Sequence, residues 1–145
     1  MFLTIVYHCT QKQKQITFSI EIDDQIMLKK SLDGSCDQFT YQFDDSDAFR
    51  AVKLRMSLQG KTHQHTMLDE QGNILSDCAV MIDSMVLDGI DVTEMFCQGF
   101  PCYTHDSNGT TSRFLDDFYG FLGCNGDVNI EFSLPLYRWF LNHCQ

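Results

Sequence analysis

The chain has 145 residues, close to the commonest size of one compact domain, and 43% of them are hydrophobic. We therefore expect a single domain over residues 1–145 with a core of its own, rather than a disordered chain. The net charge of -10 opposes binding to nucleic acid and to anionic membrane surfaces, and no apolar run is long enough to cross a bilayer.

Four segments alternate apolar and polar residues, which is the pattern of strands with one buried face. They are residues 16–23, 39–43, 52–59 and 128–133. In a fifth segment, residues 79–87, both alternating sets are apolar. One set is Val80, Ile82 and Val86, and the other is Met81, Met85 and Leu87. This fifth pattern predicts a central strand covered on both faces.

Turn and helix signals complete the pattern. Residues 71–73 read as the turn of a hairpin between residues 65–68 and 74–75. Asp91 and Glu94 have the spacing of a capping box that opens one helical turn. After Pro135, apolar residues recur at helical spacing to residue 143. The sequence therefore predicts a mainly β fold, an antiparallel β-sandwich or jelly roll with a short C-terminal helix.

Seven cysteines are scattered along the chain, an odd number without repeated close pairs. This usage is typical of free thiols in a reducing cell interior, and the first residues lack the features of a secretory signal. Cys97 and Cys102 are the only close pair. Their spacing also allows a disulfide or half of a metal site, but buried thiols are the favoured interpretation.

His63 and His65, followed by Glu70, have the spacing of part of the first cupin motif. Two histidines two apart on a strand point to one face and can share a metal, and His105 could supply a third imidazole. Glu70 directly precedes the turn at Gly72, and the second cupin motif is absent. Two surface histidines on an edge strand are therefore the favoured interpretation, with a metal-dependent enzyme as the alternative.

Acidic loops form a second candidate site. Between residues 62 and 136 there are twelve acidic residues and one base, Arg113. Asp88 and Asp91 flank a glycine, and residues 105–108 combine a histidine, a carboxylate and an amide. Carboxylate and amide oxygens are ligands that calcium prefers, so Asp88, Asp106 and Asn108 are a candidate calcium site. Ordinary turns are the competing interpretation.

Aromatic residues are dense between Gly99 and Gly126, a glycine-rich segment. They are Phe100, Tyr103, Phe114, Phe118, Tyr119 and Phe121. Exposed aromatics stack on sugar rings while acids and amides bind hydroxyl groups, so this segment favours glycan recognition; aromatic plugs at the end of a sandwich are the alternative. The predicted binding residues are Asp88, Asp91, Tyr103, His105, Asp106 and Asn108.

Several segments share a further likeness. Residues 58–61, 69–73, 82–92, 103–106, 118–120 and 123–126 together resemble a group of small, functionally uncharacterised proteins encoded by tailed phages of marine cyanobacteria. This resemblance implies expression in the cytoplasm of a bacterial host and a place in the virion. The Leu87-Asp88-Gly89 segment also resembles calcium-dependent carbohydrate-binding jelly rolls.

The chain contains none of the complete catalytic motifs of hydrolases, phosphate-binding enzymes or zinc proteases. We therefore expect a non-catalytic module that presents acidic, aromatic-rich loops to a glycan or to a phage or host protein, with calcium as a candidate cofactor. Association into homo-oligomers is left open. The alternative is a small cupin-like enzyme using His63, His65 and His105.

Overall fold

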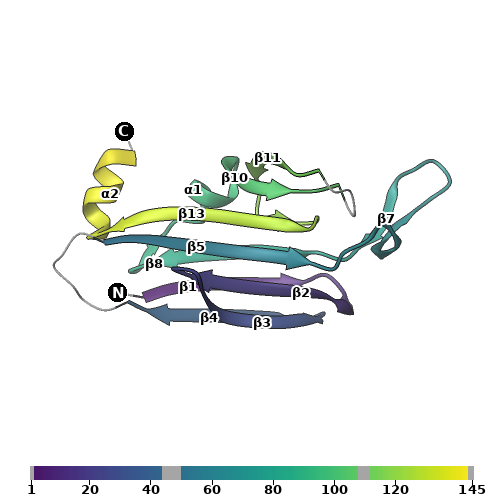
Figure 1. The fold of residues 1–145 in the computed structure, drawn as a ribbon, viewed down its shortest axis with the longest axis horizontal. Coiled ribbons are helices and arrows are strands. Elements are labelled where there is room, and N and C mark those ends of the chain that lie inside the picture. Colours follow the sequence, from purple (N-terminus) through teal and green to yellow (C-terminus); the bar gives the residue numbers. More distant parts are fainter. Residues whose placement is uncertain (1, 44–49, 108–111, 144–145) are drawn as a thin grey trace.

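The computed structural model describes residues 2–43, 50–107 and 112–143, which form a β-sandwich with two short α-helices (Figure 1). The first sheet has the strand order β12–β8–β1–β4, with β9 paired to β8. The second sheet has the order β11–β10–β13–β5–β2–β3. All pairings within these sheets are antiparallel. The predicted fold class is therefore confirmed.

The strands run between two ends of the sandwich. Their bounds are β1 Phe2–Cys9, β2 Lys12–Ile22, β3 Gln25–Asp33, β4 Cys36–Gln42, β5 Arg50–Gln59, β8 Val80–Leu87, β9 Ile90–Asp91, β10 Phe100–His105, β11 Phe114–Phe118, β12 Phe121–Leu122 and β13 Gly126–Leu134. At the helix end, on the left of Figure 1, β1 begins and β13 leads into α2 (Leu136–His143). At the hairpin end, on the right, β5 ends and β13 begins.

The core lies between the two sheets, where alternating apolar residues of their strands meet. The alternation in residues 16–23, 52–59 and 128–133 predicts that the following apolar residues face inward, and all are at most 2% exposed: Ile16, Phe18, Ile20, Ile22, Val52, Leu54, Met56, Leu58, Ile130 and Phe132. Trp139 of α2 is also buried and lies with its ring 5.7 Å from that of Phe96 in α1 (Thr93–Cys97). The predicted C-terminal helix thus closes the helix end of the core.

Strand β8 is an interior strand, but it is buried on one face only, so the predicted two-sided burial is wrong. Its register with β1 skips Asp83, because Tyr7 pairs with Ile82 and Val6 pairs with Ser84. Such a β-bulge shifts the alternation of side chains by one residue. The buried side chains are therefore Val80, Ile82, Met85 and Leu87.

The predicted hairpin is formed by β6 (Thr66–Leu68) and β7 (Ile74–Asp77), a two-stranded sheet that projects beyond the hairpin end (Figure 1). The turn predicted at Asp88-Gly89 joins β8 to β9, and both residues have positive φ. Helix α1 begins where a helical turn was expected, but without the predicted capping box. The Asp91 carboxylate instead accepts hydrogen bonds from the amide and hydroxyl groups of Thr93.

The six cysteines within the described part of the chain are free thiols, and Cys97 and Cys102 are both buried. Cys144 lies outside the described residues. Among the residues that are described, no helix has the length and apolar character needed to span a membrane.

Candidate functional site

The structure separates the two acidic loops that the sequence analysis combined into one surface. The amide of Asp88 donates a 2.8 Å hydrogen bond to the carbonyl of Phe2, which places the β8–β9 turn at the helix end. The amide of Asp106 donates to the carbonyl of Asn125, directly before β13, at the hairpin end. Asp88 and Asp91 therefore do not share a binding surface with Tyr103, His105 and Asp106.

The predicted calcium site is corrected by the same separation, because Asp88 and Asp106 lie at opposite ends of the sandwich and cannot hold one ion. Asn108 lies outside the described residues. Within residues 2–43, 50–107 and 112–143, no three His, Cys, Asp or Glu side chains come together as metal ligands.

The alternative metal site is also not assembled. His63 and His65 lie in a 3-10 helix (His63–His65), not on a strand as expected, so they do not project side by side. His65 instead closes its own turn, because its Nδ1 accepts a 2.9 Å hydrogen bond from the Thr62 amide. Both histidines and His105 are described, and they form no common ligand group. The cupin interpretation is therefore wrong for these residues.

His105 is held between two acceptors at the hairpin end of β10. Its Nδ1 lies 2.6 Å from the carbonyl oxygen of Asp106, and its Nε2 lies 3.2 Å from Oδ2 of Asp116. Because both partners accept, the ring makes both bonds at once only when both nitrogens carry a proton. The hydrogen bond from His105 is also the main reason why the pKa of the Asp116 carboxyl lies below its ordinary value.

Four rings form a stack that we call the aromatic ladder: Phe118, Tyr103, His105 and Phe114. The ring centroids of Tyr103 lie 5.7 Å from Phe118 and 4.4 Å from His105, and those of His105 and Phe114 are 4.5 Å apart. Phe118 is fully buried, Tyr103 and His105 are nearly so, and Phe114 is 48% exposed. The ladder therefore connects the core to a ring that solvent reaches.

The register of β10 and β11 explains why these side chains meet. His105 pairs with Phe114, and Tyr103 pairs with Asp116. Paired residues of antiparallel strands lie on the same face of the sheet. The side chains of these two pairs therefore project from one face, at the edge of the second sheet. Burial raises the pKa of Tyr103, whose hydroxyl donates to the Cys124 carbonyl and accepts from the Cys124 amide.

The sequence analysis predicted Tyr103, His105 and Asp106 as binding residues, and the structure brings these three together; it placed Phe114 in the aromatic-rich segment. It missed Asp116. The signal was present, because Phe114-Leu115-Asp116-Asp117-Phe118 continues the aromatic segment and carries two acids. The pairing of β11 with β10 decides that Asp116, rather than Asp117, faces His105, and that register was not evident from the sequence.

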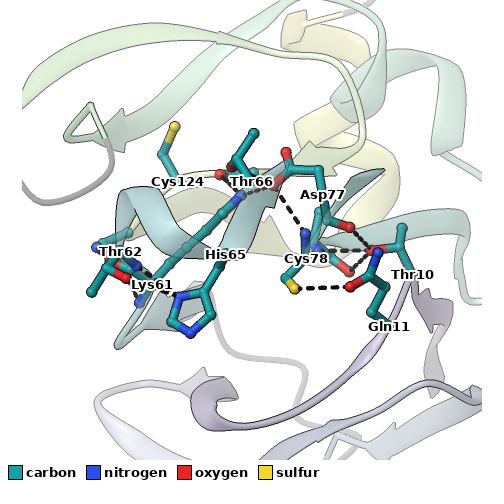
Figure 2. Close-up of polar contacts among 12 residues, drawn as sticks. Thr10, Gln11, Lys61, Thr62, His65, Thr66, Asp77, Cys78 and Cys124 are labelled. Carbon is teal, nitrogen blue, oxygen red and sulfur yellow. Dashed lines mark hydrogen bonds and ion pairs between the residues drawn. The ribbon is translucent and has the colours of Figure 1, made fainter. Parts of the chain in front are cut away.

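A polar cluster around the buried side chain of Lys61 was also missed from the sequence (Figure 2). The Nζ of Lys61 lies 2.5 Å from Oδ1 of Asp77 and 2.5 Å from the carbonyl oxygen of Gly123. The same Asp77 oxygen accepts from the Thr66 hydroxyl and from the Cys78 amide. This cluster ties the end of β5 to the base of the β6–β7 hairpin and to the loop before β13.

Asn125 links that cluster to the ladder. Its Oδ1 accepts from the Lys61 amide at 2.7 Å, while its Nδ2 donates to the Lys61 carbonyl at 2.6 Å and to Oδ2 of Asp106 at 3.2 Å. The loop beneath His105 is therefore held by side-chain hydrogen bonds as well as by strand pairing. A site built on such a support keeps its geometry when a ligand binds.

A concave feature separate from the ladder lies on the outer face of the second sheet, over β2, β5 and β13. It is a cavity of about 250 Å³ lined by Glu21, Asp24, Lys53, Leu54, Arg55, Asn129, Ile130 and Glu131. We call it the polar groove. Arg55 is held within it by Glu21 at 2.9 Å and by the amide oxygen of Asn129 at 3.0 Å, whereas Lys53 and Glu131 face one another across β5 and β13. The groove offers donors and acceptors, but no aromatic ring.

Comparison with known proteins identifies no matching family model and no matching curated protein. Two solved structures are similar in fold. "vCBM60 in complex with galactobiose" has a TM-score of 0.49 and 13% identity, covering 89% of this chain and 96% of that one. A second structure of vCBM60, described with a circular permutation linking two families of calcium-dependent carbohydrate binding modules, has a TM-score of 0.49 and 12% identity, covering 88% and 87%.

Proposed function

We propose that this chain is a non-catalytic glycan-binding module and that the sugar lies on the exposed ring of Phe114 beside the carboxylate of Asp116. One observation carries the proposal: a half-exposed aromatic ring stands at the open end of the aromatic ladder, next to a carboxylate that is 53% exposed. An apolar ring face and a neighbouring acceptor are the two elements that bind a pyranose.

Phe114 is suited to stacking because its position is fixed before a ligand arrives. Its ring packs on His105 with centroids 4.5 Å apart, and each ring nitrogen of His105 lies within hydrogen-bond distance of an acceptor. A ring that is already ordered loses little conformational freedom when a sugar binds, so more of the contact energy appears as affinity.

Asp116 supplies the polar part of the surface. Its Oδ2 faces His105 and its Oδ1 accepts from the Asp117 amide at 2.8 Å. Each carboxylate oxygen has a second lone pair, so both can also accept a hydrogen bond from a sugar hydroxyl. Like any aspartate, Asp116 is ionised at neutral pH, and a charged acceptor makes stronger hydrogen bonds than a neutral one.

The arrangement favours binding over glycoside hydrolysis. Hydrolysis generally needs two carboxyl groups that flank one glycosidic bond. Asp116 and Asp117 are consecutive on β11, so their side chains point to opposite faces of the strand. Asp106, the other acid near the ladder, is buried and bonded to Asn125.

Calcium is not assigned to this surface, because its predicted ligands Asp88 and Asp106 lie at opposite ends. The resemblance to cyanophage proteins adds two further parts to the proposal: the module acts inside a bacterial host, and it enters the virion. Mass spectrometry of purified phage particles, compared with the infected-cell lysate, tests the second part.

Calorimetric titration with a glycan panel that includes galactobiose tests the function. For a glycan that binds, Phe114→Ala weakens binding about tenfold, or about 1.4 kcal/mol, because the stacking platform is removed. Asp116→Asn weakens it less, because an amide still accepts one hydrogen bond. Phe2→Ala is the matched control, since Phe2 is 51% exposed and lies at the helix end. Parallel titrations with calcium and with a chelator give the same affinity.

The outcomes separate the function from its location. If no glycan in the panel binds, the proposed function is wrong. If a glycan binds and Phe114→Ala has no effect while Lys53→Ala and Glu131→Ala abolish binding, the function stands and the site moves to the polar groove. If the chelator abolishes binding, the calcium-free assignment is wrong.

A further inference from the structure

The β6–β7 hairpin carries apolar side chains that lie mostly in solvent. Four of its side chains are more than half exposed: Met67 at 61%, Leu68 at 56%, Ile74 at 64% and Leu75 at 65%. They occupy both faces of a two-stranded sheet that projects beyond the sandwich (Figure 1). We call this element, residues 66–77, the arm.

Burial of the exposed apolar side chains of the arm against another surface would stabilise the hairpin. A two-stranded hairpin is marginally stable in water without a further strand or helix to pack on. This hairpin is tied to the sandwich at its base, where Asp77 accepts hydrogen bonds from Nζ of Lys61 and from the Thr10 hydroxyl. Clustered exposed apolar side chains commonly mark a contact surface.

The charges around the arm indicate what covers it. The turn at its tip carries Asp69 and Glu70, and no basic residue lies between residues 66 and 77. Lys12 and Lys14, at the start of β2, are exposed, and no ion pair within the described residues uses them. They lie at the same end as the arm, because Nε2 of His65 is 3.2 Å from the Gln15 side chain at the arm's base.

We propose that the arm binds a second copy of this chain, in a dimer with two-fold symmetry formed through the hairpin ends. The apolar faces of the two arms pack together, and each acidic tip lies over Lys12 and Lys14 of the other copy. The arm and the lysines that complement its charge lie at one end of the molecule. Two copies related by a two-fold axis therefore form both sets of contacts together, which gives a closed dimer rather than a chain of subunits. Every contact is then made twice.

A second copy fits this surface better than a membrane does. The acidic turn would have to pass the headgroup region before the apolar stem reached the acyl chains. The net charge of -10 also repels anionic lipids. In a dimer the same acids face lysines, and the stem residues are buried against identical residues.

Sedimentation velocity over a range of protein concentrations tests the proposal. The wild-type chain sediments as a monomer–dimer equilibrium, and Met67→Ser combined with Ile74→Ser raises the dissociation constant at least tenfold (about 1.4 kcal/mol). Leu141→Ser is the matched control, because Leu141 is 63% exposed in α2 at the helix end. Unchanged circular dichroism of all variants shows that each remains folded.

Charge variants test the geometry. Lys12→Glu with Lys14→Glu weakens the dimer, and so does Glu70→Lys, whereas the three changes together recover part of the lost affinity. Asp69 is left intact because it accepts the amide hydrogen bonds of its own turn.

Several results would overturn the proposal. They are a wild-type chain that stays monomeric up to its solubility limit, a dimer that ignores the arm variants, and equal weakening by Leu141→Ser. Binding of the arm to phosphatidylcholine vesicles, abolished by the arm variants, would assign the surface to a membrane instead. The proposal is independent of glycan binding, because none of these variants touches Phe114 or Asp116.

Discussion

Lys61 and Asp77 form an ion pair in which the ammonium group has no contact with solvent, whereas the carboxylate does. The Lys61 side chain is 0% exposed and the Asp77 side chain 18%, with Nζ and Oδ1 2.5 Å apart. The pair joins the end of β5 to the base of the arm. Its asymmetry determines what happens when either partner is removed.

Asp77→Ala is expected to destabilise the fold more than Lys61→Met. Without Asp77, the buried ammonium keeps only the Gly123 carbonyl among its hydrogen-bond partners, and an unpaired buried charge costs about 3–5 kcal/mol. Without Lys61, the carboxylate keeps Thr66, the Cys78 amide and some solvent, so the loss is about 1–3 kcal/mol. Urea unfolding followed by the fluorescence of the single tryptophan measures both. The reverse order would contradict this account of the pair.

Gly60 and Gly72 have nearly the same backbone conformation, with φ of 87° and 83°, but different surroundings. A Cβ at Gly60 would lie 2.2 Å from the carbonyl oxygen of Gln15, whereas one at Gly72 would meet nothing within 4 Å. Gly72→Ala therefore costs only the left-handed backbone term, about 1–2 kcal/mol.

Gly60→Ala has the same backbone cost and also pushes β2 away from β5. It therefore lowers the free energy of unfolding by about 1–3 kcal/mol more than Gly72→Ala does. The same unfolding assay compares the two variants, with Gly72→Ala as the control for backbone conformation. Equal losses would show that the close approach of Gln15 does not constrain Gly60.

The strands with strict alternation were predictable from sequence, because burial on one face imposes the period directly. β2 and β5 are examples, and all their predicted inward residues are buried. β1 was not predicted, although Leu3, Ile5, Tyr7 and Cys9 face inward, because Phe2 and Val6 interrupt its polar set. In β8 the apolar residues were recognised, but one inserted residue changed which of them share a face.

The candidate site was less predictable than the fold, because it depends on contacts distant in sequence. Tyr103, His105 and Asp106 were predicted as binding residues from the residue types in their segment. The position of Asp116 beside His105 depends on the register of β10 and β11, which the sequence does not show. The separation of Asp88 from Asp106 follows from the course of whole strands. Lys61 lies among other bases in the sequence, and only the path of the arm shows that it is buried.

Asp83 is predicted to be dispensable, both as a side chain and as an inserted residue. Its carboxylate pairs with Nδ1 of His8 at 2.8 Å, and both side chains are more than a third exposed, so Asp83→Ala costs at most about 1 kcal/mol. Deleting Asp83 leaves Ile82 opposite Tyr7 and Ser84 opposite Val6 with no extra residue between them, so the strand alternates regularly and Val80, Ile82, Met85 and Leu87 still face the core. The deletion is therefore expected to lower the melting temperature no more than Asp83→Ala does. A much larger loss for the deletion in thermal melts would show that the bulge itself stabilises the fold.

The thiols are predicted to differ in reactivity according to burial. Burial raises the pKa of Cys97 to about 11 and that of Cys102 to about 12, while Cys36 is exposed. The thiolate is the reactive form, so in the native protein iodoacetamide at pH 8 modifies Cys36 rapidly and leaves Cys97 and Cys102 protected. Peptide mass spectrometry after timed quenching measures each rate. Modification of all three at one rate would contradict the predicted burial.

The same raised pKa values make stability depend on alkaline pH. The unfolded chain loses its thiol protons near pH 8.5, whereas native Cys97 holds its proton to about pH 11, so between these values the native state binds more protons than the unfolded state. The free energy of unfolding therefore falls as the pH rises from about 8.5 toward 11. Cys97→Ala with Cys102→Ala should make that fall shallower, even though the loss of packing lowers the stability at pH 7. Adding reductant at pH 7 leaves the melting temperature unchanged, since the described cysteines are free thiols. An unchanged slope in the double variant would show that these two thiols do not control the alkaline transition.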